Sequence, residues 1–311
     1  MNKFKIILVI VIGVVILFLG IGYVFVGNYF YNIAINPDSD KSVLGLGVMA
    51  EDEKAKRIEW LQNNSKDTYI TSTNNGNLKL HAYEIESNEK SDIWTIVIHG
   101  YTKNGIEMEN YAEKYKEMGY NVLLVELRGA GKSEGDYIGF GWHDRLDVID
   151  WINYLVEKDS DCKIILFGVS MGAATVMMTT GEQLPSNVKL AIEDCGYTSV
   201  YDIFANKIEN VFHLPSAPVL SAASFVTQIK SGYSLYEASS IEQIKKSQTP
   251  TLFIHGSADT FVPYNMLDIL YDAAKCEKEK VVIEGAEHAV SVQINPELYW
   301  KSISDFIEKY I

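Results

Sequence analysis

A serine with glycines two residues before and after it is the first candidate for chemistry in this sequence. Residues 168–172 read Gly-Val-Ser-Met-Gly, directly after the apolar run 163–167 and directly before a run of small residues. Where such a segment joins a strand to a helix, the serine occupies a strained turn, and the glycines let neighbouring backbone pass closely. The positive end of the helix also favours the negative charge that develops in acyl transfer. This context predicts Ser170 as a nucleophile, although the five-residue pattern alone is common.

A serine hydroxyl is a weak nucleophile until a histidine accepts its proton and an acidic side chain orients that histidine. In a strand–serine–helix arrangement, the acid and then the histidine follow the serine along the chain. Of the six histidines, only His288 comes after the last strand-like run. Asp259 follows the preceding run, and Asp194 follows the run before that. We expect Asp259 to orient His288, with Asp194 as the alternative acid.

Acyl transfer also needs two backbone N–H groups that bind the oxygen of the tetrahedral intermediate. One should belong to Met171, the residue after the nucleophile. The second should come from the loop after the strand-like run 93–99, where the sequence reads His-Gly-Tyr-Thr. We expect Tyr101 to be this second donor.

The elements that must position these residues are apolar strands that alternate with helical segments. Two alternating runs, 68–73 and 78–85, surround Asn-Asn-Gly-Asn and predict a β-hairpin. Six further strands follow, at residues 93–99, 121–126, 163–168, 189–193, 251–255 and 280–283. Short strands that are apolar on both faces and separated by helices form a mostly parallel sheet covered on both sides. The prediction is an α/β fold with an eight-stranded sheet within residues 66–311.

One interval is far longer than a single crossover helix. Residues 196–248 separate the sixth and seventh predicted strands, and their apolar positions recur at helical spacing. We expect a helical insertion that caps the carboxyl edge of the sheet, where sheets of this kind bind ligands. Phe204, Phe212 and Phe225 of this insertion are the candidates for an apolar substrate site. The alternative is that the insertion packs on the sheet without touching substrate.

The N-terminus predicts one transmembrane helix within residues 1–27. Residues 6–26 are an uncharged apolar run of about 31 Å at 1.5 Å per residue, the thickness of a bilayer core. A cleaved signal peptide is the alternative, but its apolar region is shorter and ends at small residues. Here the run continues into Tyr-Val-Phe-Val-Gly-Asn-Tyr. We therefore expect an uncleaved signal anchor, followed by a juxtamembrane stalk and a polar helix in residues 28–65.

The charges that flank this run predict its orientation. Lys3 and Lys5 precede the apolar run, whereas Asp38 and Asp40 follow it. Positive residues favour the cytoplasmic side of a membrane. We expect a single-pass protein of the cell membrane whose N-terminus is cytoplasmic and whose catalytic domain is extracellular.

The overall composition narrows the classes of partner. The net charge is −14, which argues against nucleic acid because phosphate binding needs clustered Lys and Arg. The three cysteines are widely spaced and form no metal-binding pattern with histidines. We expect them to be buried, and a disulfide is not required. No metal or cofactor is expected.

Together these features resemble the α/β-hydrolase superfamily over residues 66–311. The likeness is carried by the His99-Gly100 loop, the segment Glu-Leu-Arg-Gly-Ala-Gly-Lys-Ser at 126–133, and Ser170, Asp259 and His288 in the order of that family. Glu126 departs from it, because an aspartate usually stands there. The anchor, the stalk and the turn after Asp194 resemble membrane-anchored or cell-surface hydrolases of Gram-positive bacteria. That resemblance implies an esterase-like or prolyl-oligopeptidase-like domain without a metal or cofactor.

The expected function is that of a serine hydrolase, with a small carboxylic ester cleaved through an acyl-Ser170 intermediate. A peptidase or amidase acting on a short peptide is the second candidate, and the residues before the hairpin are too few for the propeller that oligopeptidases usually carry. A lipase or acyltransferase is a variant of the first candidate. A non-enzymatic binding module is disfavoured, because all three predicted catalytic residues are present.

Overall fold

The computed structural model describes residues 3–41, 49–73 and 76–311. It contains an eight-stranded sheet in the order β1-β2-β4-β3-β5-β6-β7-β8. The strands are β1 (Lys66–Thr71), β2 (Lys79–Ile85), β3 (Ile93–Ile98), β4 (Asn121–Val125), β5 (Lys163–Val169), β6 (Val188–Asp194), β7 (Thr251–Gly256) and β8 (Lys278–Ile283). The helices are α1 (Lys3–Ala34), α2 (Glu51–Asn64), η2 (Gly105–Met108), α3 (Glu109–Glu117), α4 (Asp144–Lys158), α5 (Met171–Thr180), α6 (Val200–Val211), α7 (Ser216–Ser231), α8 (Ser240–Ile244), α9 (Asn265–Ala273), α10 (Ser291–Ile294) and α11 (Pro296–Ile307).

The sheet confirms the predicted α/β-hydrolase fold. Strands β1 and β2 pair antiparallel as a hairpin, β2 also pairs antiparallel with β4, and the remaining strand pairs are parallel. Residues 74 and 75 of the predicted hairpin turn lie outside the described residues. The central strands carry apolar side chains on both faces, as strands of a covered parallel sheet must.

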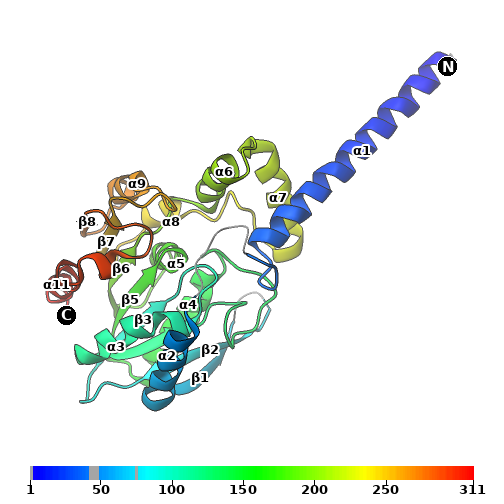
Figure 1. Cartoon of the computed structure of the whole chain (residues 1–311). Coiled ribbons are helices and arrows are strands. Elements are labelled where there is room, and N and C mark those ends of the chain that lie inside the picture. Colours follow the sequence, from blue (N-terminus) through cyan, green and yellow to red (C-terminus); the bar gives the residue numbers. More distant parts are fainter. Residues whose placement is uncertain (1–2, 42–48, 74–75) are drawn as a thin grey trace.

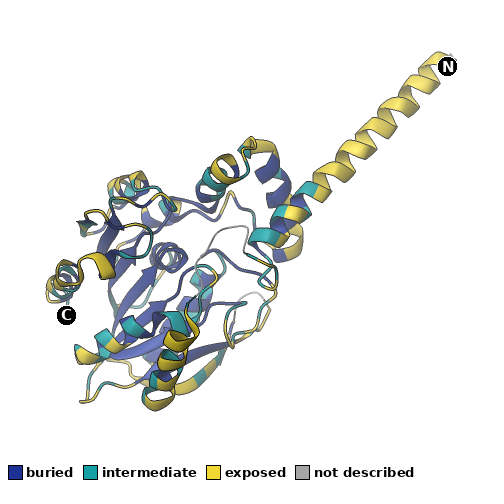
Figure 2. Ribbon diagram, viewed as in Figure 1, coloured by how far each residue is buried: buried dark blue, intermediate teal, exposed yellow. Residues whose placement is uncertain are grey.

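Two layers of helices cover the sheet, and each layer buries one face of it. On one face, Ile96 and Leu166 pack with side chains of α4 and α5, and on the other face, Val97 and Phe167 pack with α3 and α11. Alternate residues of one strand thus enter opposite cores, which is the two-residue period of a strand. Figure 2 shows the buried strands and α5 enclosed by helices whose outer sides are exposed.

The long interval after β6 folds mainly into two helices, α6 and α7, which lie over the carboxyl edge of the sheet (Figure 1). The third helix of the predicted insertion, α8, packs differently. Its buried Ile244 belongs to the same hydrophobic cluster as Met177 of α5 and Leu267 of α9. Because this apolar side chain completes the core beside the sheet, α8 belongs with the sheet-covering helices. We use "cap" below for residues 200–231, which hold α6 and α7.

Helix α1 is long and apolar enough to cross a membrane, and its first part stands away from the domain (Figure 1). It continues to Ala34, past the predicted end of the span at residue 27. The start of the predicted stalk at residue 28 is therefore helical and packed, because Tyr31 is buried with its Oη 3.0 Å from Ser231 Oγ, and Ile35 is only 1% exposed. Residues 42–48 of the stalk lie outside the described residues, and the polar helix expected next is α2.

Candidate active site

Ser170 occupies the sharp turn between β5 and α5. Its backbone has φ +58° and ψ −114°, in the left-handed half of the map where a residue with a side chain is strained. The flanking glycines have a steric reason. A Cβ on Gly168 would lie 2.3 Å from backbone atoms of Gly172, and a Cβ on Gly172 would lie 2.2 Å from the carbonyl oxygen of Ile98. The turn can form here only because neither position carries a side chain.

A chain of hydrogen bonds joins Ser170 to two loops at the carboxyl edge of the sheet. Ser170 Oγ lies 2.8 Å from His288 Nε2, and His288 Nδ1 lies 2.7 Å from Asp259 Oδ2. Asp259 follows β7 and His288 follows β8. An ionised carboxylate only accepts hydrogen bonds, so Nδ1 carries the proton and Nε2 can accept from the serine hydroxyl. The structure thus brings the three residues together in the geometry of a serine–histidine–acid triad.

The surroundings of Asp259 keep it ionised. Burial opposes its charge, but hydrogen bonds from His255 and His288 outweigh burial and lower the pKa of Asp259 to about 2. Asp259 Oδ1 also accepts the backbone N–H groups of Phe261 and Val262, each at 2.9 Å. The carboxylate is therefore held from both oxygens, with Oδ2 turned to the histidine.

His255 is a residue of this site whose role the sequence did not reveal. Its Nε2 lies 3.3 Å from Asp259 Oδ2 and 3.1 Å from the carbonyl oxygen of Val262. Both neighbours accept, so Nε2 carries a proton, and Asp259 Oδ2 faces two histidines. The available signal was a His-Gly pair at the end of a strand, four residues before the acid, which is equally typical of a simple turn.

Asp194, the alternative acid, lies on the neighbouring strand end and does not contact His288 by a hydrogen bond in the described residues. Its Oδ2 accepts from the hydroxyl of Tyr299 at 2.9 Å, and its carbonyl oxygen accepts the backbone N–H of Ser170 at 2.8 Å. Burial raises the pKa of the Asp194 carboxyl to about 6. Asp194 thus supports the turn that carries Ser170 from below.

The two expected oxyanion donors lie on either side of Ser170. Met171 is the first residue of α5, where backbone N–H groups have no partner within the helix. The loop with Tyr101 approaches closely, because a Cβ on Gly100 would lie 3.3 Å from the carbonyl oxygen of Val169 and 3.5 Å from Ser170 Cβ. Both backbones are therefore next to Ser170, where the predicted oxyanion hole requires them.

Ser170 opens into an apolar cavity beneath the cap. The cavity has a volume of about 130 Å³. Phe204 and Phe212 line it, as do residues of α1, α7 and the Tyr101 loop. Phe225 does not line it, because its side chain points outward, is 47% exposed and lies against Tyr23 of α1. The structure therefore brings two of the three candidate phenylalanines to the site.

A second and more polar cleft meets Ser170 from the other side. It is lined by Ser170, His288 and Phe261 together with polar side chains such as Arg57 and Asn110. The Phe261 ring lies on the His288 imidazole, with centroids 4.7 Å apart. Ser170, the predicted nucleophile, thus lies where an apolar cavity and a polar cleft meet.

A model of the X-Pro dipeptidyl-peptidase (S15) family matches residues 59–231. The chain belongs to this family. It is 29% identical to the protein YqkD of Bacillus subtilis over 214 residues, which cover 68% of this chain and 70% of YqkD. It is 22% identical to a thermostable monoacylglycerol lipase of Bacillus sp. strain H-257 over 249 residues, which cover 71% of this chain and 93% of the lipase.

Among solved structures, an esterase of Pyrococcus furiosus superposes with a TM-score of 0.66 at 22% identity, over 85% of this chain and 96% of the esterase. At this identity the superposition shows that the fold is shared. Membership of the S15 family and the relatives found by sequence make the protein a serine hydrolase. The expected enzyme class and the resemblance to α/β-hydrolases are thereby confirmed.

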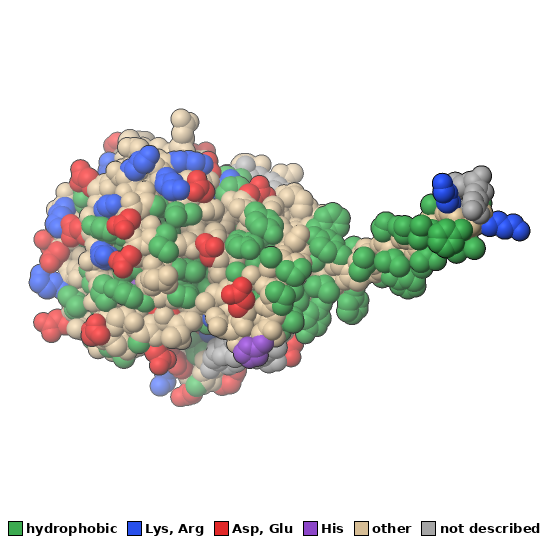
Figure 3. Space-filling model, turned by 90° about the horizontal axis from the view of Figure 1, so that it is seen from above, with side chains coloured by type: hydrophobic (Ala, Val, Ile, Leu, Met, Phe, Trp, Pro, Cys, Tyr) green, Lys and Arg blue, Asp and Glu red, His purple; other side chains and the backbone are tan. Residues whose placement is uncertain are grey.

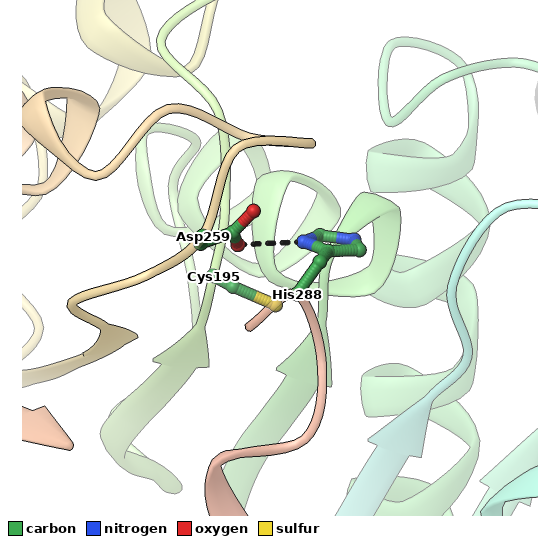
Figure 4. Close-up of side chains that lie close together, drawn as sticks. All are labelled: Cys195, Asp259 and His288. Carbon is green, nitrogen blue, oxygen red and sulfur yellow. Dashed lines mark hydrogen bonds and ion pairs between the residues drawn. The ribbon is translucent and has the colours of Figure 1, made fainter. Parts of the chain in front are cut away.

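Cys195 completes a cluster with Asp259 and His288 whose ligand-type atoms lie within 4.8 Å of one another (Figure 4). This donor set fits a metal ion poorly. His288 Nδ1 and Asp259 are bonded to each other, and burial raises the pKa of the Cys195 thiol, so sulfur is protonated and a weak ligand. All three cysteines are buried, as expected from the sequence, and their thiols are free.

Proposed function

We propose that the protein hydrolyses carboxylic esters through an acyl intermediate on Ser170. The observation that carries this proposal is the continuous hydrogen-bonded chain from Ser170 Oγ through His288 to Asp259, with both links shorter than 3 Å. The strained backbone of Ser170 at the start of α5 supports it, since this turn exposes the hydroxyl towards the two cavities.

In the proposed reaction, His288 Nε2 takes the proton from Ser170 Oγ as the oxygen attacks the ester carbonyl. The N–H groups of Tyr101 and Met171 bind the oxyanion of the tetrahedral intermediate. His288 then protonates the leaving alcohol and, in the second half, takes a proton from water that attacks the acyl-serine. Asp259 holds the imidazole in the required tautomer and stabilises its positive form.

The apolar cavity favours an ester over a peptide. None of the described residues that line it is acidic, and its only charged side chain is Lys207. A dipeptidyl-peptidase has to hold the free ammonium group of its substrate, and among the described residues that line either cavity the acidic side chain is Glu107 of the polar cleft. The name of the S15 family nevertheless makes a peptidase the second candidate. The lipase relative supports the first.

We also propose that α1 anchors the enzyme in the cell membrane with the catalytic domain outside. The helix is apolar enough to span a bilayer. Lys3 and Lys5 at its start, against Asp38 and Asp40 after its end, support a cytoplasmic N-terminus. A reporter fused to either terminus and probed for protease access in intact cells would test this orientation; a protected C-terminus would contradict it.

Labelling with a fluorophosphonate tests the nucleophile. We expect the full-length protein to be labelled, Ser170→Ala not to be, and Ser160→Ala, which replaces an exposed serine far from the site, to be labelled like the wild type. A wild type that takes no label would overturn the proposal. Parallel turnover of p-nitrophenyl esters and X-Pro p-nitroanilides decides between esterase and peptidase, and faster anilide cleavage would favour the second candidate.

A further inference from the structure

The end of the membrane helix forms part of the wall of the active-site cavity. Phe30, Ile33 and Ala34 of α1 line the same apolar cavity as Ser170. The Phe30 ring meets Phe212 of the cap edge-on, with centroids 5.3 Å apart. A segment that serves only as a tether would need no contact with the site. Here the last turn of α1 closes a side of the cavity that the cap leaves open.

The same turn is bonded to a residue that the proposed mechanism uses. The hydroxyl of Tyr101 donates to the carbonyl oxygen of Ala34 at 2.9 Å, while the backbone of Tyr101 lies beside Ser170. Ala34 is the last residue of α1, where carbonyl groups lack a partner within the helix. The loop of the proposed oxyanion hole is thus positioned in part by the end of the membrane helix.

The packing between α1 and the cap is close. A Cβ on Gly27 would lie 2.3 Å from the carbonyl oxygen of Ala222 and 2.7 Å from a methyl group of Val226, so the two helices meet at backbone distance. Tyr23 Oη and Ser221 Oγ form a hydrogen bond of 2.8 Å along the same seam. The position of the cap, and with it the shape of the cavity, is therefore tied to the membrane helix.

The cavity wall lies near the depth of lipid headgroups. Phe30 follows Val26, the end of the apolar run, by one helical turn, or roughly 6 Å along the axis. The polar layer on each side of a bilayer core is about 5–8 Å thick. With residues 6–26 spanning the core, the Phe30 side of the cavity would lie within this polar layer, near the ester bonds of lipids.

The cap presents apolar surface next to this wall. Ile229 of α7 is 68% exposed, and Val211 of α6 lines the cavity and is yet 45% exposed, so the cavity wall reaches the surface there. Figure 3 shows hydrophobic side chains along α1 that continue onto the adjoining part of the domain. Apolar surface that continues from a membrane helix is suited to contact with a bilayer.

We propose that α1 is a substrate-binding element as well as an anchor, and that the substrate is a bilayer-resident ester whose long acyl chain lies against Phe30, Ile33 and Ala34. The apolar chain occupies the cavity under the cap, and the polar alcohol part lies in the cleft with Arg57 and Asn110. This inference rests on the proposed ester hydrolysis at Ser170.

The first test uses substitutions in α1 that either fill or widen the cavity. Full-length protein in detergent micelles is assayed with p-nitrophenyl acetate and p-nitrophenyl octanoate. Ala34→Phe should lower the octanoate-to-acetate ratio of kcat/KM at least tenfold, because the added ring takes the space of the chain. Phe30→Ala should lower the same ratio by roughly fourfold through lost apolar contact. Asn32→Ala, an exposed neighbour on the same turn, is the matched control and should keep the wild-type ratio.

The second test asks where the substrate comes from. The full chain is reconstituted into phosphatidylcholine vesicles, with monooleoylglycerol either in the same vesicles or in separate ones. We expect hydrolysis to be at least fivefold faster in the same vesicles, while p-nitrophenyl acetate added to the water is cleaved equally in both preparations. Equal rates on monooleoylglycerol in the two arrangements would overturn the bilayer source.

The outcomes separate this inference from the function on which it rests. A wild type that cleaves neither p-nitrophenyl ester and takes no fluorophosphonate overturns the proposed function, and the inference with it. A wild type that cleaves both esters, with unchanged ratios in Ala34→Phe and Phe30→Ala, overturns the role of α1 alone. If Ala34→Phe does not fold, the ratio measured for Phe30→Ala, a smaller change, decides whether α1 contributes to substrate binding.

Discussion

The buried carboxyl edge of the sheet and the cap with the end of α1 border the same cavity, but they are built by different forces. At the sheet edge, Ser170, His288 and Asp259 are joined by hydrogen bonds of 2.7–2.8 Å, and both oxygens of Asp259 are held. Under the cap, the walls are mainly aromatic and aliphatic side chains such as Phe204 and Phe30, which pack against one another and are joined by few hydrogen bonds. Directional bonds set distances between reacting atoms, whereas apolar packing sets a shape.

The difference indicates that proton transfer and binding of an apolar chain depend on different parts of the proposed site. The proposed proton transfer requires fixed geometry, and the residues proposed for it follow strand ends of one sheet. Selection of an apolar chain requires only a surface of the right outline. Side chains of a helix that is distant in the sequence can form part of such a surface, and those of α1 do so here.

The largest effect should come from breaking the orienting contact at the sheet edge. In Asp259→Asn, the amide can donate to His288 Nδ1 and turn the imidazole to the wrong tautomer. We expect kcat/KM on p-nitrophenyl acetate to fall by about ten-thousand-fold, the size of the loss when such an aspartate becomes asparagine in a serine protease. Asp194→Asn, on the neighbouring strand end, should cost less than tenfold. A reversed order of the two variants would move the acid to Asp194.

A smaller effect should come from removing a side chain that lines the cavity under the cap. Phe204→Ala removes a ring that lines the cavity, whereas Phe225→Ala removes an exposed ring of the same cap. We expect Phe204→Ala to lower the octanoate-to-acetate ratio of kcat/KM roughly tenfold and Phe225→Ala to change it less than twofold. Equal effects in the two variants would mean that the cavity under the cap does not hold the chain.

Glu193, the buried acid next to Asp194, should make the thermal stability of the protein depend on pH. Burial raises the pKa of Glu193 to about 8 from an ordinary value of 4.5. A raised pKa means that the stabilising contribution of protonated Glu193 is complete below pH 4.5 and is lost as the pH rises through about 8. Glu193→Gln should therefore have a Tm roughly 2–4 °C above that of the wild type at a pH above 8.

Thermal unfolding of the full-length protein in micelles across this range measures the effect. The difference between Glu193→Gln and wild type should shrink as the pH is lowered towards 4.5. The exposed Glu284→Gln is the matched control and should follow the wild type. A constant difference at every pH would show that the Glu193 carboxyl does not change its charge in the folded state.

The smallest effect should come from one hydrogen bond between the two regions, from the Tyr101 hydroxyl to the end of α1. Tyr101→Phe removes the hydrogen bond to the carbonyl oxygen of Ala34 and keeps the ring in place. A hydrogen bond contributes roughly 0.5–1.5 kcal/mol net, so we expect kcat/KM on p-nitrophenyl acetate to fall about threefold. Tyr154→Phe removes a hydroxyl that is bonded to Glu84, away from the site, and should leave this rate unchanged. Identical rates in both variants would mean that the end of α1 does not position the loop.

Much of the sheet could be predicted because its physics is local. Each buried parallel strand is an apolar run bounded by polar turns, and all eight strands lie close to the expected positions. The turn at Ser170 was predictable for the same reason, since the flanking glycines answer a steric demand within five residues. The sequence predicted the contact of Asp259 with His288 but not its contact with His255. The second contact depends on how the loop after β7 folds, which brings the His255 imidazole to the carboxylate.

The sequence by itself determined the order of strands and helices along the chain, a serine in the turn after a strand, and an N-terminal helix apolar enough for a membrane. Only the tertiary structure decided that this helix runs on to Ala34 and closes the cavity, and that Phe204 faces Ser170 while Phe225 faces outward. The reason is that apolar residues at helical spacing predict a buried face but not the partner that buries it. Rotation and docking of α1, α6 and α7 depend on contacts between residues some 200 positions apart, such as Tyr31 with Ser231.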